Sequence, residues 1–293
     1  MKQIKNVLLI INFDKNIPDI FLDTLDNILK KSDCSLYLFN ETSDYLSNRG
    51  SSLSGEIITV SSLLNTIDLA IVLGGDGSIL KAATQVCAYN IPILGINFGT
   101  LGYMAELEAA DILKVEDVLN GNYKLEERMM LSAQVKKNDQ SVVMMPPALN
   151  DIVLSNGPIA RLLNFSVSCN NVLIERCRAD GLVVSSPTGS TAYSMSAGGP
   201  ILAPSLNAFC ITPICPHSFG NRPVILHGDD KVIISNIEVV KDNSVYLTVD
   251  GRLVEKLEKG DSVHISRSMS ITTLVRLKDN SFLSVLNSKL QEI

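Results

Sequence analysis

The stretch LAIVLGGDGS, residues 69–78, joins an apolar run to a glycine turn that carries one carboxylate, Asp76. Apolar residues recur at helical spacing from Ser78 to Ala88, so the turn is predicted to lie between a buried strand and the N-terminus of a helix. Glycines let phosphate oxygens approach the backbone, and the N–H groups of a helix N-terminus point at the anion. A carboxylate beside a phosphate needs a metal ion or a hydroxyl next to it. The stretch therefore favours phosphoryl transfer.

This glycine turn does not match two common nucleotide-binding motifs. The chain has no G-x-x-x-x-G-K-[ST] sequence, which excludes a P-loop, and Gly75 and Gly77 lack the third glycine of a dinucleotide-binding fingerprint. Many glycine turns only close a connection between a strand and a helix. That alternative stays open while the motif is considered alone.

The first hundred residues alternate short apolar runs with helical patterns. They predict strands at Val7–Phe13, Ser35–Phe39, Ile67–Leu73 and Ile91–Phe98, and helices at Ile20–Lys30 and Ile79–Ala88. This order is typical of a doubly wound, Rossmann-like α/β domain, in which ligands bind at the carboxyl ends of the strands. We expect this domain to cover residues 1–105 and to carry the glycine turn.

Beyond about residue 105 short β-branched runs dominate, after one predicted helix at Asp111–Leu119. The runs predict strands at Leu131–Lys137, Asp151–Leu154, Asn164–Cys169, Val172–Arg176, Gly181–Ser185, Lys231–Ser235, Val245–Asp250, Ser262–Ser266 and Ile271–Leu277. Many short strands with Asn, Gly and Asp turns indicate an antiparallel, β-sandwich-like domain over residues 106–277. A last helix is predicted at Ser281–Leu290, and we expect residues 278–293 to pack back on the first domain.

Length and charge limit the function classes. A chain of 293 residues is long for one core and fits two domains. Its net charge of −6 argues against a general nucleic-acid surface, which would be basic. A small-molecule partner fits better, since a few Arg and Lys residues can supply local positive charge.

Cysteine spacing and the N-terminal run indicate the compartment. The six cysteines form no C-x-x-C pair and no zinc-like spacing with histidine, so buried, reduced thiols are expected. Lys2 and Lys5 precede an apolar run as in a signal peptide, but the run ends at Asn12 and has no small-residue cleavage site. No apolar run approaches the roughly 18 residues of a membrane span. We expect a cytoplasmic protein without a membrane partner.

A second group of polar residues lies in RADGLVVSSPTGSTAYSMSAGGP, residues 178–200. A short apolar strand runs here into hydroxyls, glycines and one tyrosine, a composition that offers hydrogen-bond donors to a polar ligand. An ordinary Ser/Thr/Gly loop would look similar, so composition alone does not decide between the two.

Together, GGDGS and the later TGSTAYS segment closely resemble the NAD kinase family. Further matches in family order are NFGTLGY at residues 97–103, Asn150-Asp151 and Asp250-Gly251, so the resemblance spans roughly residues 70–255. GGDG alone is weak, because diacylglycerol and sphingosine kinases share it and 6-phosphofructokinases have a looser form. The long TGSTAYS segment is the specific match.

The resemblance implies an activity and its cofactors. It implies a kinase that uses ATP and Mg²⁺, or another divalent metal, to phosphorylate the 2′-hydroxyl of the adenosine ribose of NAD, giving NADP. NAD and ATP would be its partners. The family forms dimers and tetramers through the β domain, and covering strand edges in this way is favourable, so a homo-oligomer is expected.

The resemblance also implies roles for individual residues. Asp76 would be the catalytic residue, positioning the hydroxyl and accepting its proton late, with the phosphates near Gly74, Gly75, Gly77 and Ser78. No metal-ligand set in the chain is implied. Contacts to NAD are implied for Asp76, Gly77, Lys81, Asn150, Asp151, Arg161, Arg178, Asp180, Thr191, Ala192, Tyr193, Ser194, Met195 and Ser196.

Several alternatives remain beside this interpretation. Without the resemblance, Lys81, Arg161 and Arg178 are as readily solvated surface residues, and Arg252 stands where the family commonly has glutamine. A lipid or sphingoid-base kinase could use the same GGDG turn, although the polar TGSTAYS loop argues against a hydrophobic acceptor. A catalytically idle NAD-binding sensor is the alternative from another class. The three histidines are expected to be structural.

Overall fold

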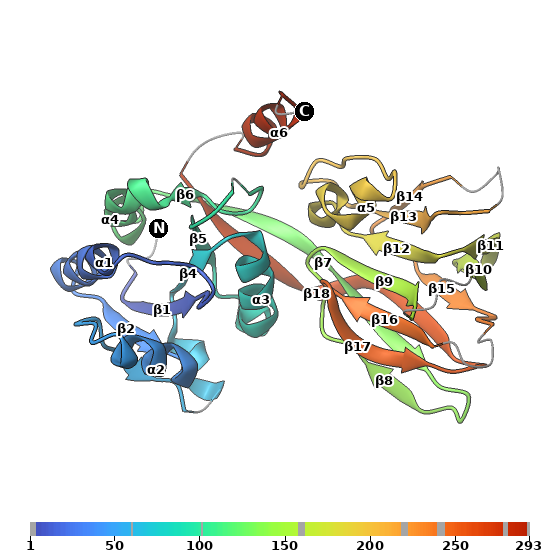
Figure 1. The fold of residues 1–293 in the computed structure, drawn as a ribbon, viewed down its shortest axis with the longest axis horizontal. Helices are drawn as coiled ribbons and strands as arrows, with labels where there is room; N and C mark the ends of the chain where they lie inside the picture. Colours follow the sequence, from blue (N-terminus) through green and yellow to red (C-terminus); the bar gives the residue numbers. More distant parts are fainter. Residues whose placement is uncertain are drawn as a thin grey trace. The chain divides into compact units, whose positions relative to one another are not determined.

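The computed structural model describes residues 4–59, 61–100, 102–157, 162–217, 222–238, 244–277 and 281–291. The chain forms two compact units, shown with their elements in Figure 1. The first unit is Met1–Glu127 with Thr272–Ile293, and the second is Arg128–Ile271.

A parallel sheet forms the centre of the first unit. Its strand order is β18-β5-β4-β1-β2-β3, with β6 also pairing with β5. The strands are β1 (Asn6–Ile11), β2 (Ser35–Leu38), β3 (Glu56–Ile57), β4 (Leu69–Gly74), β5 (Ile93–Asn97), β6 (Leu107–Glu108) and the end of β18 (Ser262–Arg276). Strand β2 pairs with one edge of β1, and β4 pairs with the opposite edge of β1. The strand order therefore reverses between β1 and β4.

Helices cover both faces of this sheet. The unit contains α1 (Asp19–Lys31), α2 (Asn40–Asn48), α3 (Asp76–Val86), α4 (Val115–Leu119), α6 (Ser281–Gln291) and 3-10 turns at Ser61–Thr66, Cys87–Tyr89 and Ala109–Lys114. Leu25 of α1 and Val118 of α4 share a core with Leu9 and Ile71 of the sheet. Ile79 of α3 lies against Gly95 of β5, whose missing side chain gives it room. The predicted doubly wound α/β fold is confirmed.

The second unit is an antiparallel β-sandwich, as predicted. One sheet has the order β14-β13-β12-β9-β16-β17, and the other contains β11-β10-β15-β18 with β7 and β8. Apolar residues of both sheets, among them Leu131, Leu154, Phe209 and Val263, form one buried core. The elements are β7 (Lys124–Lys136), β8 (Val142–Met144), β9 (Asp151–Asn156), β10 (Leu163–Cys169), β11 (Val172–Ala179), β12 (Gly181–Ser185), a 3-10 turn (Thr188–Thr191), α5 (Tyr193–Ser196), β13 (Ala208–Ile214), β14 (Val224–His227), β15 (Val232–Ser235), β16 (Val245–Val249) and β17 (Arg252–Leu257).

The limits of the units differ from those expected. The change of pattern near residue 105 does not end the first unit, because Leu107, Val115 and Leu119 still pack into its core. The chain enters the second unit only at Arg128, within β7. Ser262–Ser266 and Ile271–Leu277, predicted as two strands, form the single strand β18. Arg267 stands where the alternation of Val263 and Ile265 would continue with an apolar residue, and it interrupts this pattern in the sequence.

Several elements were not predicted, among them α2 and β13. Helix α2 is mostly polar and buries little besides Thr42 and Leu46, so its apolar periodicity is weak. Strand β13 contains Pro213, which usually argues against a strand. Pro213 lies beyond Ile211, the last residue paired with β14, so its missing N–H costs no ladder bond on that side.

Two expectations concern the whole chain. Buried cysteines were expected, and Cys87, Cys177 and Cys210 are buried, whereas Cys34 and Cys169 are partly exposed and Cys215 is exposed. In the part of the chain that the structure describes, no helix has the length and apolar character needed to cross a membrane.

Candidate functional site

The glycine turn lies where β4 ends and α3 begins, in the first unit. Gly75 precedes the helix, and the Ser78 and Ile79 N–H groups donate to its carbonyl at 2.9 and 3.2 Å. The N–H groups of residues 75–77 come before this first helical bond and have no partner inside the helix. They form a donor set suited to an anion.

The three glycines of the turn serve different purposes. A Cβ at Gly74 would overlap the Ser78 side chain, so this glycine is required by internal packing. A Cβ at Gly77 would meet nothing within 4 Å, and one at Gly75 would meet only Asn97 Oδ1 at 3.8 Å. Gly75 and Gly77 therefore leave the open space that a phosphate group could occupy.

Asp76 is held in place by the loop that follows β5. Its Oδ2 accepts a hydrogen bond from the Tyr103 N–H at 2.8 Å, and its Oδ1 accepts one from the Met104 N–H at 3.1 Å. A Cβ at Gly102 would overlap this carboxylate, which explains why the loop carries a glycine there. Both carboxylate oxygens are thus fixed by backbone donors, and their remaining lone pairs can serve an acceptor hydroxyl.

Two residues at the carboxyl end of β1 join this site, and sequence reasoning missed both. Asn12 Nδ2 donates to Ser78 Oγ at 3.0 Å, which ties the β1 loop to the glycine turn. Lys15 Nζ lies 3.0 Å from the Cβ position of Gly99. Because the strand order reverses between β1 and β4, ligands of such sheets bind between these two loops. The available signal was their place at the carboxyl end of the first predicted strand, Val7–Phe13.

Asn97 adds an oxygen without a partner. It ends β5 and is 2% exposed, and its Nδ2 donates to the Gly99 carbonyl and to both Glu108 oxygens. Its Oδ1 is buried and has no hydrogen-bond partner among the described residues, although it faces Gly75. A buried acceptor of this kind usually has a partner, so Asn97 marks a place for a donor or a cation.

In the second unit, Asn150 and Asp151 are organised by the turn between β16 and β17. The Asp250 carboxylate accepts hydrogen bonds from the N–H groups of Leu149, Asn150 and Asp151 at 2.7 to 3.1 Å. Asp250 and Gly251 have positive φ, as an Asp-Gly hairpin turn requires. Asn150 Oδ1 is buried without a partner in the described structure.

Asp151 is a strongly perturbed acid. Burial first, and the Asp250 carboxylate second, raise the pKa of Asp151 to about 7. Burial also raises the pKa of Asp250, although its three backbone hydrogen bonds act in the opposite direction. Perturbed acids of this kind are typical of functional sites.

The TGSTAYS loop is built on buried hydroxyls. Ser186 Oγ donates to the Leu149 carbonyl, and Ser190 Oγ accepts the Leu202 N–H at 2.9 Å. A Cβ at Gly189 would overlap the Asn150 backbone, so this glycine lets the loop lie directly against Asn150. The side chain of Ser194 is fully buried against Thr212, where it supports the loop.

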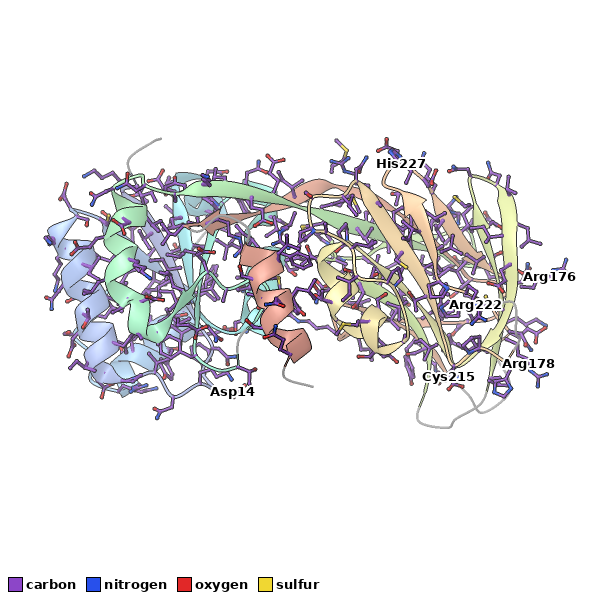
Figure 2. The ribbon with its side chains drawn as sticks, turned by 90° about the horizontal axis from the view of Figure 1, so that it is seen from above. Asp14, Arg176, Arg178, Cys215, Arg222 and His227 are labelled. Carbon is purple, nitrogen blue, oxygen red and sulfur yellow. The ribbon has the colours of Figure 1, made fainter. Side chains whose placement is uncertain are left out.

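The other predicted contact residues are accessible. Tyr193 and Met195 are 46% and 40% exposed, Ser196 is exposed, and Thr191 and Ala192 are partly exposed. Arg178 and Asp180 are exposed at the end of β11, and Figure 2 shows Arg178 near Arg176. Lys81 is exposed on α3. Arg161 lies outside the described residues.

The predicted residues therefore form two groups, one in each unit. The first unit brings residues 74–78 together with the loops after β1 and β5. The second brings Asn150 and Asp151 together with Asp250 and the TGSTAYS loop. Among the described residues no cluster of three His, Cys, Asp or Glu could hold a metal ion by itself.

Comparisons with known proteins agree with these two groups. Residues 31–123 match the family model of the ATP-NAD kinase N-terminal domain, and residues 149–277 match that of the C-terminal domain. An NAD kinase of Natranaerobius thermophilus is 39% identical over 289 residues, 98% of each chain. One of Geobacter sp. strain M21 is 43% identical over 76% of this chain and 77% of its own.

Two solved structures share the fold. The structure of yeast NADH kinase complexed with NADH has a TM-score of 0.88 at 26% identity, covering 99% of this chain and 88% of its own. The structure of an NAD kinase from Archaeoglobus fulgidus in complex with ATP has a TM-score of 0.75 at 22% identity, covering 98% of this chain and 99% of its own. The second likeness concerns the fold alone.

Proposed function

Because this chain belongs to the NAD kinase family, we propose that it transfers the γ-phosphoryl group of ATP to the 2′-hydroxyl of the adenosine ribose of NAD, giving NADP. The observation that carries this proposal is the Asp76 carboxylate, fixed by two backbone amides beside an open glycine turn. A fixed carboxylate next to a phosphate-sized space is what an alcohol-accepting kinase needs.

The donor phosphates fit the first unit. The free N–H groups at the start of α3 and the open positions of Gly75 and Gly77 suit phosphate oxygens. Lys15, in the loop after β1, adds a cation beside Gly99 of the loop after β5. Phosphoryl transfer depends mainly on positioning and charge neutralisation, and these groups supply both.

Asp76 serves the acceptor. A carboxylate accepts hydrogen bonds and therefore orients a hydroxyl group, and it can take up the proton as the phosphoryl group arrives. Its two amide bonds keep it from rotating, which preserves the alignment that an in-line transfer requires.

A divalent cation is part of the proposal, and the residues present fit it. Mg²⁺ is commonly bound by one or two protein oxygens together with substrate phosphates and water. The unpartnered Asn97 Oδ1 beside Gly75 is such an oxygen, and Asp76 is the nearby carboxylate of the turn. When bound, the ion would neutralise charge on the transferred phosphoryl group.

The dinucleotide fits the second unit. Asn150, Asp151, Tyr193 and the backbone of residues 191–196 offer acceptors, donors and one aromatic ring, which suit ribose hydroxyls and an adenine. Support also comes from the yeast NADH kinase of the same fold, whose structure contains NADH. We propose Lys81, Arg161, Arg178 and Asp180 as further contacts to NAD.

The direct test is an assay of the purified protein with NAD, ATP and Mg²⁺. An NADP-specific dehydrogenase should detect the product, because it responds to a phosphate on the 2′-oxygen. An NAD analogue with a 2′-deoxy adenosine ribose should give no product in the same assay. If the natural substrates yield no NADP, the proposal is wrong.

Replacing Asp76 separates catalysis from binding. Asp76→Asn should abolish turnover but leave NAD affinity within about tenfold, because the charge acts mainly in the transition state. Calorimetric titration with NAD measures the second quantity. Loss of binding together with turnover would instead make Asp76 an organiser of the ligand site.

A further inference from the structure

We propose that Arg276 is a positioning residue for Asp76, acting through the backbone of Tyr103 and Met104. The proposal rests on the function proposed above, since it assigns Arg276 to the same reaction. Arg276 ends β18, far from the glycine turn in sequence, and neither its pattern nor its neighbours in the sequence suggested a role.

The connection between Arg276 and Asp76 consists of hydrogen bonds on both sides of the same loop. The N–H groups of Tyr103 and Met104 donate to the Asp76 carboxylate at 2.8 and 3.1 Å. The carbonyl oxygens of the same two residues accept from Arg276, Met104 O from Nη1 at 2.9 Å and Tyr103 O from Nη2 at 3.5 Å. The loop backbone therefore lies between the guanidinium and the carboxylate.

The peptide group between Tyr103 and Met104 makes this connection stiff. Its C=O belongs to Tyr103 and its N–H to Met104, and in a trans peptide the two point in opposite directions. The carbonyl meets Arg276 while the N–H meets Asp76 Oδ1. Rotating this peptide would break both bonds at once. Hydrogen bonds in such a chain also polarise one another.

Arg276 is itself fixed in position. It is 4% exposed, its Nε donates to Glu126 Oε2 at 2.5 Å, and its Nη1 also contacts Glu106 Oε2 at 3.3 Å. Glu106 Oε1 accepts the Leu277 N–H, which anchors the end of β18. Only a planar guanidinium presents enough donors to reach two carbonyls and two carboxylates together. A lysine could satisfy only some of them.

The C-terminal helix holds the other side of the loop. The Tyr103 ring lies 5.9 Å from the Phe282 ring, and Lys289 Nζ of α6 lies 4.8 Å from the Tyr103 ring centre. The side chain of Tyr103 is thus held by α6 while its backbone is held by Arg276. Together they restrict the loop whose amides fix Asp76.

The test compares Arg276→Lys with wild type in the full-length protein. The change keeps the charge but loses the forked donor, so the loop should loosen and kcat should fall by about 10- to 100-fold. The KM values for NAD and ATP should stay within about threefold, because the carboxylate is misplaced rather than removed. Amide hydrogen exchange should rise at Tyr103 and Met104 and not across the protein.

A second variant guards against misfolding. Arg276→Met alone would remove the guanidinium that the buried Glu106 carboxylate contacts, so the double variant Arg276→Met with Glu106→Gln is used beside it. The double variant should show the same loss of kcat and the same rise in amide hydrogen exchange at Tyr103 and Met104. Its melting temperature should be nearly unchanged. Arg49→Lys is the matched control, since Arg49 bonds to Tyr45 and Asp19 in the same unit but does not contact this loop.

Two results would overturn the proposal. One is wild-type kcat in both Arg276 variants, and the other is a loss of activity that only follows a global rise in exchange. Failure of the proposed function is a different outcome, in which the wild type makes no NADP. The exchange measurement still tests the loop in that case, because Asp76→Asn and Arg276→Lys should expose the same two amides.

Discussion

At the scale of single residues, Asp151 shows how burial turns an acid into a sensor of pH. It is 5% exposed, and the Asp250 carboxylate lies next to the same backbone segment. Its carboxyl group, with a pKa raised to about 7, holds a proton more tightly in the folded chain than in the unfolded chain. This raised affinity stabilises the fold only while Asp151 is protonated.

Asp151→Asn should therefore change the pH dependence of stability. An unfolded Asp has a pKa of about 3.9, so the contribution from Asp151 is complete below that pH and is lost as the pH rises towards 7. The amide of Asn carries no charge, so it avoids the cost of a buried carboxylate. The free energy of unfolding of the variant should exceed that of wild type by about 1 to 3 kcal/mol at pH 8 and by little at pH 4. Thermal melts without ligand measure this difference.

The control for this prediction is Asp44→Asn, on the exposed side of α2. It should leave the difference between pH 4 and pH 8 as in wild type. An equal effect of Asp151→Asn at both pH values would show that ionisation of Asp151 does not penalise the fold.

Lys15 is the second residue whose role can be tested alone. Lys15→Met should raise the KM for ATP by about 10- to 100-fold, the loss expected for one charge-assisted hydrogen bond to a phosphate. The KM for NAD should change little, because its proposed contacts lie elsewhere. Steady-state kinetics with each substrate varied in turn separate the two.

Lys31→Met is the matched control for Lys15. Lys31 is a surface lysine of the same unit, and its ion pair is with Glu116 of α4. It should leave both KM values unchanged. An unaltered KM for ATP in Lys15→Met would remove Lys15 from the proposed phosphate site.

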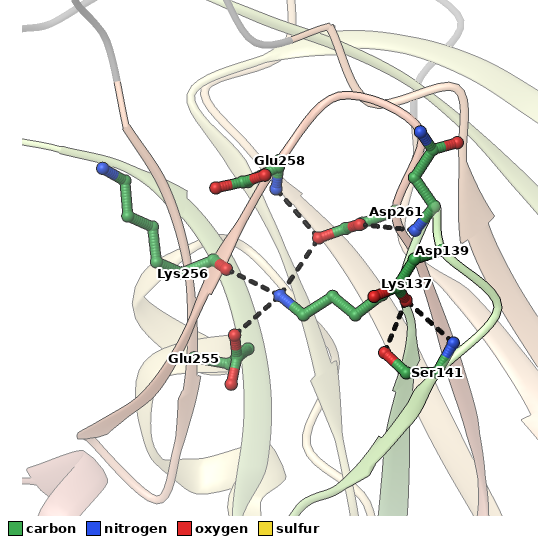
Figure 3. A network of polar contacts seen from close by, with 8 residues as sticks. Lys137, Asp139, Ser141, Glu255, Lys256, Glu258 and Asp261 are labelled. Carbon is green, nitrogen blue, oxygen red and sulfur yellow. Dashed lines mark hydrogen bonds and ion pairs between the residues drawn. The ribbon is translucent and has the colours of Figure 1, made fainter.

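At the scale of elements, one partly buried lysine joins two hairpins of the second unit (Figure 3). Lys137, after β7, places its Nζ 2.7 Å from Glu255 Oε1, 3.1 Å from the Lys256 carbonyl and 3.2 Å from Asp261 Oδ2. Asp261 is 2% exposed and also accepts the N–H groups of Asn138 and Glu258. Burial alone would lower the pKa of Lys137, but its bonds to Glu255 and Asp261 raise it.

Lys137→Met should destabilise the protein by about 2 to 4 kcal/mol, because it leaves the Asp261 carboxylate buried without its cation. Urea unfolding measures the change. The neighbouring Lys136→Met, on an exposed position of β7, should stay within about 0.5 kcal/mol of wild type. Similar losses in both variants would mean that the buried network adds no stability beyond general effects of charge.

At the scale of the whole molecule, the chain divides the proposed chemistry between its two units. The glycine turn, Lys15 and Asp76 belong to the α/β unit, whereas Asn150, Asp151 and the TGSTAYS loop belong to the β-sandwich. Strands β7 and β18 each have residues in both units. Each unit has its own buried core.

We propose that the protein forms a dimer or a tetramer through the second unit. Strand β11 pairs only with β10 among the described strands, and Val172 and Leu173 on it are 68% and 49% exposed. Such an edge is favourable to cover. Light scattering should give a multiple of the monomer mass, and Leu173→Lys should reduce that mass.

The control for the oligomer is Leu113→Lys, because Leu113 is an apolar residue of the first unit that is 67% exposed, more than Leu173. It should keep the wild-type mass. A monomeric wild type would contradict the assembly itself, whereas an unchanged mass in Leu173→Lys would exclude only the β11 edge.

The sequence by itself determined the fold class, the family and the residues that carry its motifs. These features are local: apolar periodicity sets strands and helices, and GGDG and TGSTAYS are continuous segments. The sequence also placed the glycine turn correctly between β4 and α3. It could not reveal β18 as one strand, because the polar Arg267 interrupts the apolar alternation there.

Only the tertiary structure decided how these residues are held. The donors to Asp76 come from 27 and 28 residues away in the chain, the donors to Asp250 from about 100, and the Arg276 bonds from about 170. The structure also showed that Ser194 is buried and that Lys15 lies beside Gly99. Local patterns decide which element a residue joins. Packing of distant segments decides which groups meet, and no spacing in the sequence encodes that.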